Sequence, residues 1–88
     1  MQEQSIRLLL IEDNPIHARL IERLLEGEPQ LKCKLERVDN LADGMARLAQ
    51  GRIDLLLLDL VLPDCQELET LFRVRSTHPN IPIVVLTS

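Results

Sequence analysis

The 88-residue sequence predicts a single domain of the α/β class, built around a parallel sheet, over residues 1–88. The main observation is that short apolar runs alternate with longer amphipathic stretches along the whole chain, with no linker or repeat between them. Hydrophobic residues make up 45% of the chain and charged residues 27%, which are globular proportions. A disordered or fibrous chain is therefore excluded.

The first strand and helix are predicted from residues 6–26. Residues 6–11 read IRLLLI, a short apolar run that is typical of a buried strand. Asn14 stands at a helix N-cap position and Pro15 at the first helical position. Apolar residues then recur at helical spacing, which predicts a helix over about 15–26, ended by Gly27.

The second strand and helix follow the same order. Apolar and charged residues alternate over 31–36 (LKCKLE), as in an edge strand with one face in water. Asn40 is a second N-cap, with Asp43 at the third helical position. An apolar stripe follows, and Gly51 ends the predicted helix.

The last predicted elements are a strand, a helix and a strand. Residues 53–58 are almost entirely apolar, which indicates a central strand covered on both faces and terminated by Asp59. Pro63 and Asp64 mark a loop. Apolar residues from Leu68 onward indicate a third helix, and residues 81–86 (IPIVVL) indicate a fourth strand.

Charge and composition exclude several classes of partner. The net charge is −4 and no basic run is present, so direct contact with nucleic acid is not expected. The apolar runs are far shorter than the roughly 18 residues needed to cross a bilayer, and no signal peptide is recognisable, so we expect no membrane contact and a cytoplasmic location. Cys33 and Cys65 lack the spacing of a zinc site and are expected to be free thiols.

Acidic residues follow two strands that would be neighbours in such a sheet. Glu12 and Asp13 follow the first strand, Asp59 ends the third, and Thr87 ends the fourth. In open α/β sheets ligands bind at the carboxyl ends of the strands. Two unit charges about 4 Å apart repel by roughly 4 kcal/mol at an effective dielectric of about 20, so the cluster needs a proton or a cation. Hard oxygen ligands favour Mg²⁺.

Either of two interpretations fits these acidic residues. Taken singly, an acidic residue after a strand most often caps the next helix or solvates a loop. Taken jointly, an acidic pair, a strand-terminal Asp and a strand-terminal Thr favour a site, because a carboxylate can be the nucleophile of a phosphoryl transfer. His17, in the first turn of the first helix, lies near this edge and is expected to be an exposed residue without a role.

Three segments resemble one known family, the receiver domains of two-component response regulators. They are LLLIEDNP at 8–15, DLLLLDLVLPD at 54–64 and PIVVLTS at 82–88, and the resemblance extends over essentially the whole chain. It implies a flavodoxin-like, doubly wound sheet with strand order 2-1-3-4, to which the family adds a fifth strand.

The resemblance also implies roles for individual residues. Asp59 matches the residue that accepts a phosphoryl group from the phosphohistidine of a histidine kinase. Glu12 and Asp13 match the acidic pair that holds Mg²⁺, in which Asp13 and Asp59 bind the ion directly and Glu12 binds it partly through water. The backbone carbonyl of Val61 would supply another oxygen, and Thr87 matches the switch hydroxyl that turns toward the phosphoryl group.

The sequence departs from the family pattern in two places. Glu67 stands where the family usually has a Gly in the turn before the third helix. The sequence also stops at Ser88, before the fifth strand, its Lys and the last two helices, so we expect a fragment or a shortened receiver. The strand at 81–87 would then be an exposed edge and a site of homodimer formation.

Three functions remain open at this point. The leading one is a phosphoacceptor that is not an enzyme, with a histidine kinase or phosphotransfer protein as donor and an output domain beyond Ser88 or in another chain. The missing Lys favours a pseudo-receiver, an interaction module that works without phosphorylation. A magnesium-dependent aspartyl phosphohydrolase is weaker, because it needs a second Asp where Pro15 stands.

Overall fold

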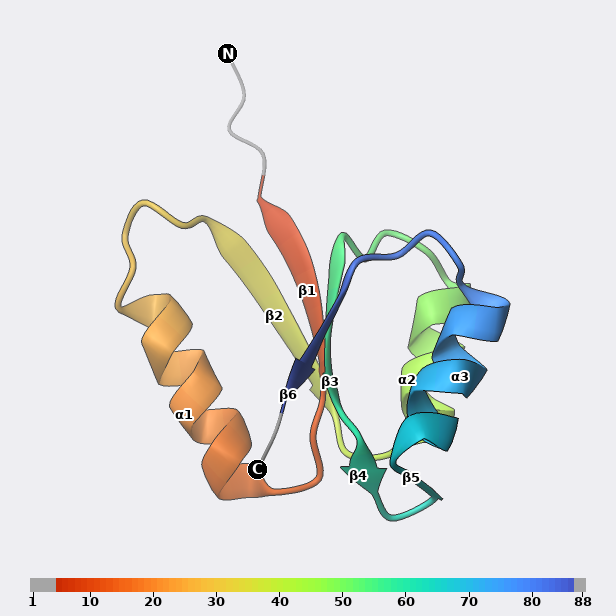
Figure 1. Ribbon diagram of the computed structural model, residues 1–88. Coiled ribbons are helices and arrows are strands. Elements are labelled where there is room, and N and C mark those ends of the chain that lie inside the picture. Colours follow the sequence, from red (N-terminus) through yellow and green to blue (C-terminus); the bar gives the residue numbers. More distant parts are fainter. Residues whose placement is uncertain (1–4, 87–88) are drawn as a thin grey trace.

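A computed structural model describes residues 5–86 of the chain (Figure 1). The elements are β1 (Ile6–Ile11), α1 (Pro15–Glu26), β2 (Cys33–Val38), α2 (Leu41–Ala49), β3 (Leu55–Asp59), β4 (Val61–Leu62), β5 (Cys65–Gln66), α3 (Leu68–Thr77) and β6 (Ile83–Leu86). Four strands form a parallel sheet in the order β2-β1-β3-β6, which confirms the predicted α/β class and strand order. The strands β4 and β5 form a small antiparallel hairpin after β3.

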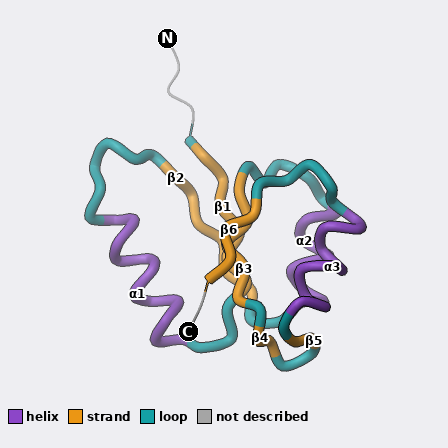
Figure 2. The backbone as a smooth tube through the Cα atoms, viewed as in Figure 1, coloured by secondary structure: helices purple, strands orange, loops and turns teal. Residues whose placement is uncertain are grey.

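Helices α2 and α3 cover one face of the sheet, and α1 covers the other (Figures 1 and 2). The core under α2 and α3 contains Leu9, Ile11, Leu41, Leu48, Leu56, Leu58, Leu62, Cys65 and Val74. A smaller core under α1 contains Leu10, Ala18 and Leu57. The interior strands β1 and β3 are therefore buried on both faces, and the residues at their carboxyl ends are held in place by the core.

The predicted caps are present at the first two helices. The Asn14 side chain accepts hydrogen bonds from the backbone N–H groups of Ile16 (2.9 Å) and His17 (3.4 Å), and Pro15 is the first residue of α1. The Asn40 side chain accepts one from Asp43 N–H at 2.8 Å. These bonds satisfy amide groups that a helix leaves unpaired at its start, so the sequence signals act as predicted.

A long-range cap at α2 was not predicted. The carboxylate of Asp64, in the β4-β5 turn, accepts from Leu41 N–H at 2.8 Å and from Ala42 N–H at 2.9 Å. These hydrogen bonds, the one from Leu41 first, lower the pKa of Asp64. The loop after Asp59 is thereby tied to the start of α2.

Three strands begin later than their sequence patterns suggested. The second strand begins at Cys33 and not at residue 31, the third at Leu55 and not at residue 53, and the fourth at Ile83 and not at residue 81. Each starts where a residue of the neighbouring strand faces it: Cys33 pairs with Ile6, for example, and Leu55 with Leu8. Alternation and apolar runs do not report this pairing, because it depends on distant residues.

The state of the two cysteines agrees with the sequence analysis. Cys33 and Cys65 are free thiols, and Cys65 is buried. Within residues 5–86, no helix is both long enough and apolar enough to span a bilayer.

Glu67, in the turn before α3, has a backbone φ of +60° and ψ of −139°. Residues other than glycine rarely adopt this backbone conformation. Each one that does lowers the free energy of unfolding by about 1–3 kcal/mol. The Glu67 side chain makes no capping hydrogen bond at α3. We therefore expect Glu67→Gly to raise the free energy of unfolding by about 1 kcal/mol in urea titrations. Glu67→Ala is the matched control, since it removes the charge but keeps Cβ, and an equal gain in both variants would contradict backbone strain as the cause.

Candidate functional site

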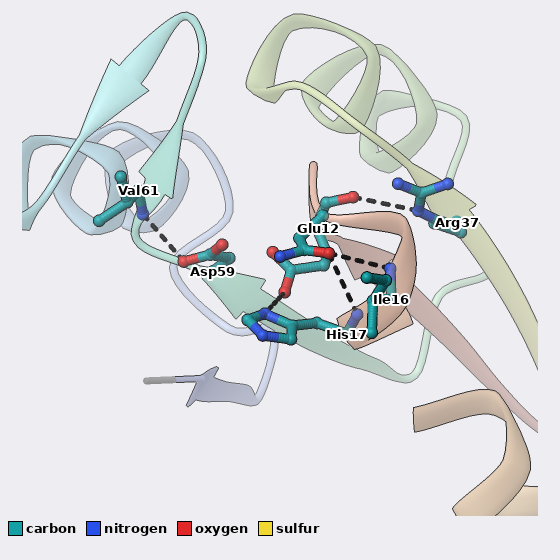
Figure 3. A network of polar contacts seen from close by, with 7 residues as sticks. Glu12, Ile16, His17, Arg37, Asp59 and Val61 are labelled. Atoms are coloured by element: carbon teal, nitrogen blue, oxygen red, sulfur yellow. Dashed lines mark hydrogen bonds and ion pairs between the residues drawn. The ribbon is translucent and has the colours of Figure 1, made fainter. Parts of the chain in front are cut away.

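Three carboxylates meet at the carboxyl ends of β1 and β3. Glu12 and Asp13 directly follow β1, and Asp59 is the last residue of β3. One oxygen of each lies within 4.8 Å of the other two. The two strands pair in parallel up to Ile11 and Leu58, so both chains end at the same edge of the sheet. The predicted convergence of these residues is therefore present, and Figure 3 shows two of them, Glu12 and Asp59.

Two of the three carboxyl groups are buried. Glu12 is 3% exposed and Asp59 is 6% exposed, whereas Asp13 is exposed. Burial, followed by the hydrogen bond and the charge of Asp59, raises the pKa of Glu12 to about 7, and His17 acts in the opposite direction. Two carboxyl groups can share a hydrogen bond only while one of them holds a proton. The pair is therefore stable with one proton or with a cation between the groups.

The Glu12 carboxyl group has a free position for such a cation. Its Oε2 atom is buried and has no hydrogen-bond partner within residues 5–86. A buried unpaired carboxylate oxygen is costly, and a divalent ion among three oxygen ligands would satisfy it. The donor set, all carboxylate oxygen with one exposed member, fits a hard ion that keeps some of its water.

The backbone of Glu12 is anchored to the edge strand β2. Its N–H group donates to Val38 O at 3.0 Å, and its carbonyl accepts from Arg37 Nε at 3.0 Å. The loop that begins at Glu12 is thus fixed by main-chain contacts, independently of the carboxyl group (Figure 3).

The loop after Asp59 is held equally firmly. Asp59 Oδ1 accepts from Val61 N–H at 3.0 Å. The Leu60 carbonyl accepts from Glu67 N–H at 2.6 Å and from Thr70 Oγ1 at 3.0 Å, and Thr70 is fully buried. The Asp59 carboxylate is therefore oriented by its own loop through Oδ1.

The comparisons with known proteins agree with this geometry. The family model described as the response regulator receiver domain matches residues 8–88. The chain belongs to the receiver domain family of two-component response regulators. It is 36% identical over 83 residues to the swarming motility regulation protein RssB of Serratia marcescens, a match that covers 94% of this chain and 36% of RssB.

Solved structures of receiver domains have the same fold. The MaeR response regulator bound to beryllium trifluoride has a TM-score of 0.82 and 25% identity, and the match covers 96% of this chain and 68% of that one. The phosphorylated cyanobacterial phytochrome response regulator RcpA has a TM-score of 0.81 and 33% identity, with 93% and 64% covered. The receiver domain spans about a third of the length of the first curated relatives that it matches, 35% and 36%.

Of the two remaining predicted site residues, the structure describes Val61. Val61 follows Asp59 by two positions, and its backbone N–H group donates a hydrogen bond to the Asp59 carboxylate. Thr87 lies outside the described residues. The last described residue of β6, Leu86, pairs with Asp59 in the sheet.

His17 makes a contact with the acidic cluster that the sequence analysis did not predict. Its Nδ1 atom lies 3.1 Å from Glu12 Oε1, and its side chain is 43% exposed. Both residues line a pocket of about 580 Å³ together with Asp59, Leu20, Ile21, Val85 and Leu86. A signal was present, because side chains in the first turn of a helix point back toward the preceding loop, here the one that carries Glu12.

Proposed function

We propose that the receiver domain is a phosphoacceptor, which takes a phosphoryl group onto Asp59 with Mg²⁺ bound by the acidic cluster. The observation that carries this proposal is the buried pair of Glu12 and Asp59, in which Glu12 Oε2 has no partner within the described residues. A buried pair of acidic groups, one of which has a raised pKa, is typical of a functional site.

The chemistry proposed for Asp59 is nucleophilic. Since Oδ1 is engaged by the Val61 amide, Oδ2 attacks the phosphorus of a phosphohistidine. A P–O bond forms, the P–N bond breaks, and the donor imidazole leaves with the bonding electron pair and takes up a proton. The product is an acyl phosphate at Asp59, and the hydroxyl of Thr87 would then turn toward it.

The residues proposed to hold Mg²⁺ are Asp13, Asp59, Glu12 and the backbone carbonyl of Val61. When bound, the ion supplies positive charge that offsets the carboxylates and the transferred group. The chain itself orients the acceptor, through the bond from Val61 N–H and the anchored Leu60 carbonyl. Solvent reaches the site on the side of exposed Asp13.

The donor and the output are proposed from the family. A histidine kinase or phosphotransfer protein would supply the phosphoryl group in the cytoplasm, and an output domain beyond Ser88 or in another chain would respond. The titles of the MaeR and RcpA structures describe a beryllium trifluoride complex and a phosphorylated protein, which supports the same chemistry here by similarity.

Labelling with acetyl phosphate and Mg²⁺ tests this function. We expect one acid-labile phosphoryl group per chain, detected by mass spectrometry, and no labelling when Mg²⁺ is removed by chelation. A chain that stays unlabelled with Mg²⁺ present would favour the pseudo-receiver.

Mg²⁺ is expected to stabilise the fold. An ion that binds only the folded state at about ten times its Kd adds about 1.4 kcal/mol to the free energy of unfolding. Millimolar Mg²⁺ should therefore raise the melting temperature of the unsubstituted chain, and Asp13→Asn should remove most of that rise. Glu26→Gln, at the exposed end of α1, controls for general ionic effects. An undiminished response in Asp13→Asn would refute the assignment.

The 88-residue chain is expected to self-associate through β6. This strand is at the edge of the described sheet, contains no charged residue, and exposes Val84 (45%) and Val85 (38%). Uncharged apolar edges pair with other strands. Sedimentation at micromolar concentration should show dimers or larger species, and Val84→Lys should disperse them. Leu24→Lys, on exposed α1, should not, and a monomeric unsubstituted chain would contradict the prediction.

A further inference from the structure

The peptide group between Leu60 and Val61 connects the proposed acceptor, Asp59, to helix α3. This peptide group is trans and planar, so the Leu60 carbonyl and the Val61 N–H group point in opposite directions from one rigid unit. The Val61 N–H group donates to Asp59 Oδ1 at 3.0 Å (Figure 3). The Leu60 carbonyl accepts two hydrogen bonds from the start of α3. Any group that fixes this carbonyl therefore also fixes the N–H group that holds the carboxylate.

The two donors to the Leu60 carbonyl differ in kind. One is the backbone N–H group of Glu67, at 2.6 Å, and the other is the side-chain hydroxyl of Thr70, at 3.0 Å, in the first turn of α3. A carbonyl oxygen has two lone pairs and can accept both bonds at once. A single hydrogen bond leaves a peptide group free to tilt about that bond, so the Thr70 hydroxyl adds the second constraint.

The Thr70 hydroxyl is a polar group at an otherwise apolar position. Thr70 is fully buried, and Val74, one turn later in α3, is fully buried in the core. Packing alone would therefore be satisfied by valine at position 70. A buried hydroxyl is costly unless it is hydrogen-bonded, so the bond from Thr70 to Leu60 is kept in the folded chain.

We propose that Thr70 is a positioning residue for phosphoryl transfer, which acts through the Leu60–Val61 peptide group to hold the Asp59 carboxylate in its attacking orientation. This inference rests on the proposed function, in which Asp59 is the acceptor. Threonine has one O–H donor, and Leu60 takes it, so Thr70 acts on the carboxylate only through the main chain. A nucleophile that is held in a poorer orientation reacts more slowly, even where its reaction partner still binds.

The competing explanation gives the Thr70 hydroxyl a structural role alone. In that case its loss would lower the melting temperature, but the folded chain would be phosphorylated at an unchanged rate. A positioning role predicts instead that the maximal rate falls while the KM for the phosphodonor is kept.

The test compares side chains at position 70 in two pairs, each matched closely in shape and differing in the hydroxyl. The pairs are the unsubstituted chain with Thr70→Val, and Thr70→Ser with Thr70→Ala, and the second pair decides the question if Thr70→Val does not fold. Time courses of labelling by acetyl phosphate at saturating Mg²⁺, followed by mass spectrometry, give the maximal rate and the KM. Thermal melts verify folding.

We expect loss of the hydroxyl to lower the maximal rate by about tenfold in each pair and to change the KM by less than about twofold. Thr77→Val is the matched control. It removes a hydroxyl from an exposed residue of the same helix, where Thr77 Oγ1 donates to Arg73 O at 3.2 Å, and should change neither quantity.

A second readout needs neither phosphorylation nor a metal. The hydrogen bond to Asp59 protects the Val61 amide proton from exchange with solvent. In NMR exchange measurements without Mg²⁺, this proton should exchange at least about tenfold faster in Thr70→Val and Thr70→Ala than in their hydroxyl-bearing partners. The amide of Leu57, inside β3, reports global unfolding and should not follow this change.

The outcomes separate the role of Thr70 from the proposed function. A maximal rate that is kept in both hydroxyl-free variants, or Val61 exchange that changes only as Leu57 exchange does, would overturn the role of Thr70 while Asp59 remains the acceptor. If the unsubstituted chain takes up no label, or Asp59→Asn is still labelled, the proposed function fails instead. Exchange at Val61 then decides by itself whether Thr70 orients the carboxylate.

Discussion

The Asp59→Asn variant is expected to take up no phosphoryl group from acetyl phosphate and Mg²⁺. Asparagine has the same shape as aspartate, and its oxygen can still accept from Val61 N–H, so the loop should keep its structure. Its amide nitrogen cannot act as the nucleophile, however. Mass spectrometry under acid-free conditions should therefore show complete loss of the label, while thermal melts show a folded chain.

A second substitution in the same loop serves as the control. Asp64→Asn removes the same charge five positions later in the chain, at an exposed residue whose oxygen contacts the start of α2 and not the acidic cluster. This variant should still be labelled. Label that persists in Asp59→Asn would place the acceptor elsewhere, and loss of label in both variants would make the loop structure, and not the carboxylate, the deciding feature.

A large loss of stability is expected from Gly44→Val. Gly44 is buried in α2, and a Cβ atom built there would come within 2.3 Å of Ile11 Cδ1 and 2.9 Å of Ile11 Cγ1. Ile11 is fully buried between the sheet and α2, so it cannot move aside freely. Overpacking of this kind costs about 1–3 kcal/mol, and we expect Val to lower the free energy of unfolding by about 3 kcal/mol in urea titrations.

Ala46→Val is the control for Gly44→Val. It introduces the same β-branched residue into α2 at an exposed position and should cost only its helix propensity, about 0.6 kcal/mol. Gly44→Ala should fall between the two variants, because its helix propensity gain of about 1 kcal/mol offsets part of the overlap. Equal losses in Gly44→Val and Ala46→Val would show that the contact with Ile11 is tolerated. Because Ile11 precedes Glu12, Gly44→Val should also reduce the stabilisation by Mg²⁺.

The order of elements and the convergence of three site residues were predictable from the sequence. Hydrophobic periodicity and the caps at Asn14 and Asn40 depend on residues only a few positions apart. The meeting of Glu12, Asp13 and Asp59 followed because parallel strands end at the same edge of a sheet, once the first and third strands are taken as neighbours.

The features that required the structure are contacts between segments far apart in the chain, together with burial. The Asp64 carboxylate reaches α2 across more than twenty positions, and no local pattern reports such a partner. The short hairpin β4-β5 was missed because two-residue strands have no periodicity.

The sequence alone thus determined the α/β class, the strand order implied by the family motifs, and the identity of the clustered carboxylates, because local periodicity and strand-terminal position carry that information. Only the tertiary structure determined the electrostatic environment of these carboxylates. Burial of Glu12 against Asp59, the raised pKa of Glu12 and the contact with His17 all depend on packing around the ends of β1 and β3, since desolvation and charge proximity arise only when distant segments meet.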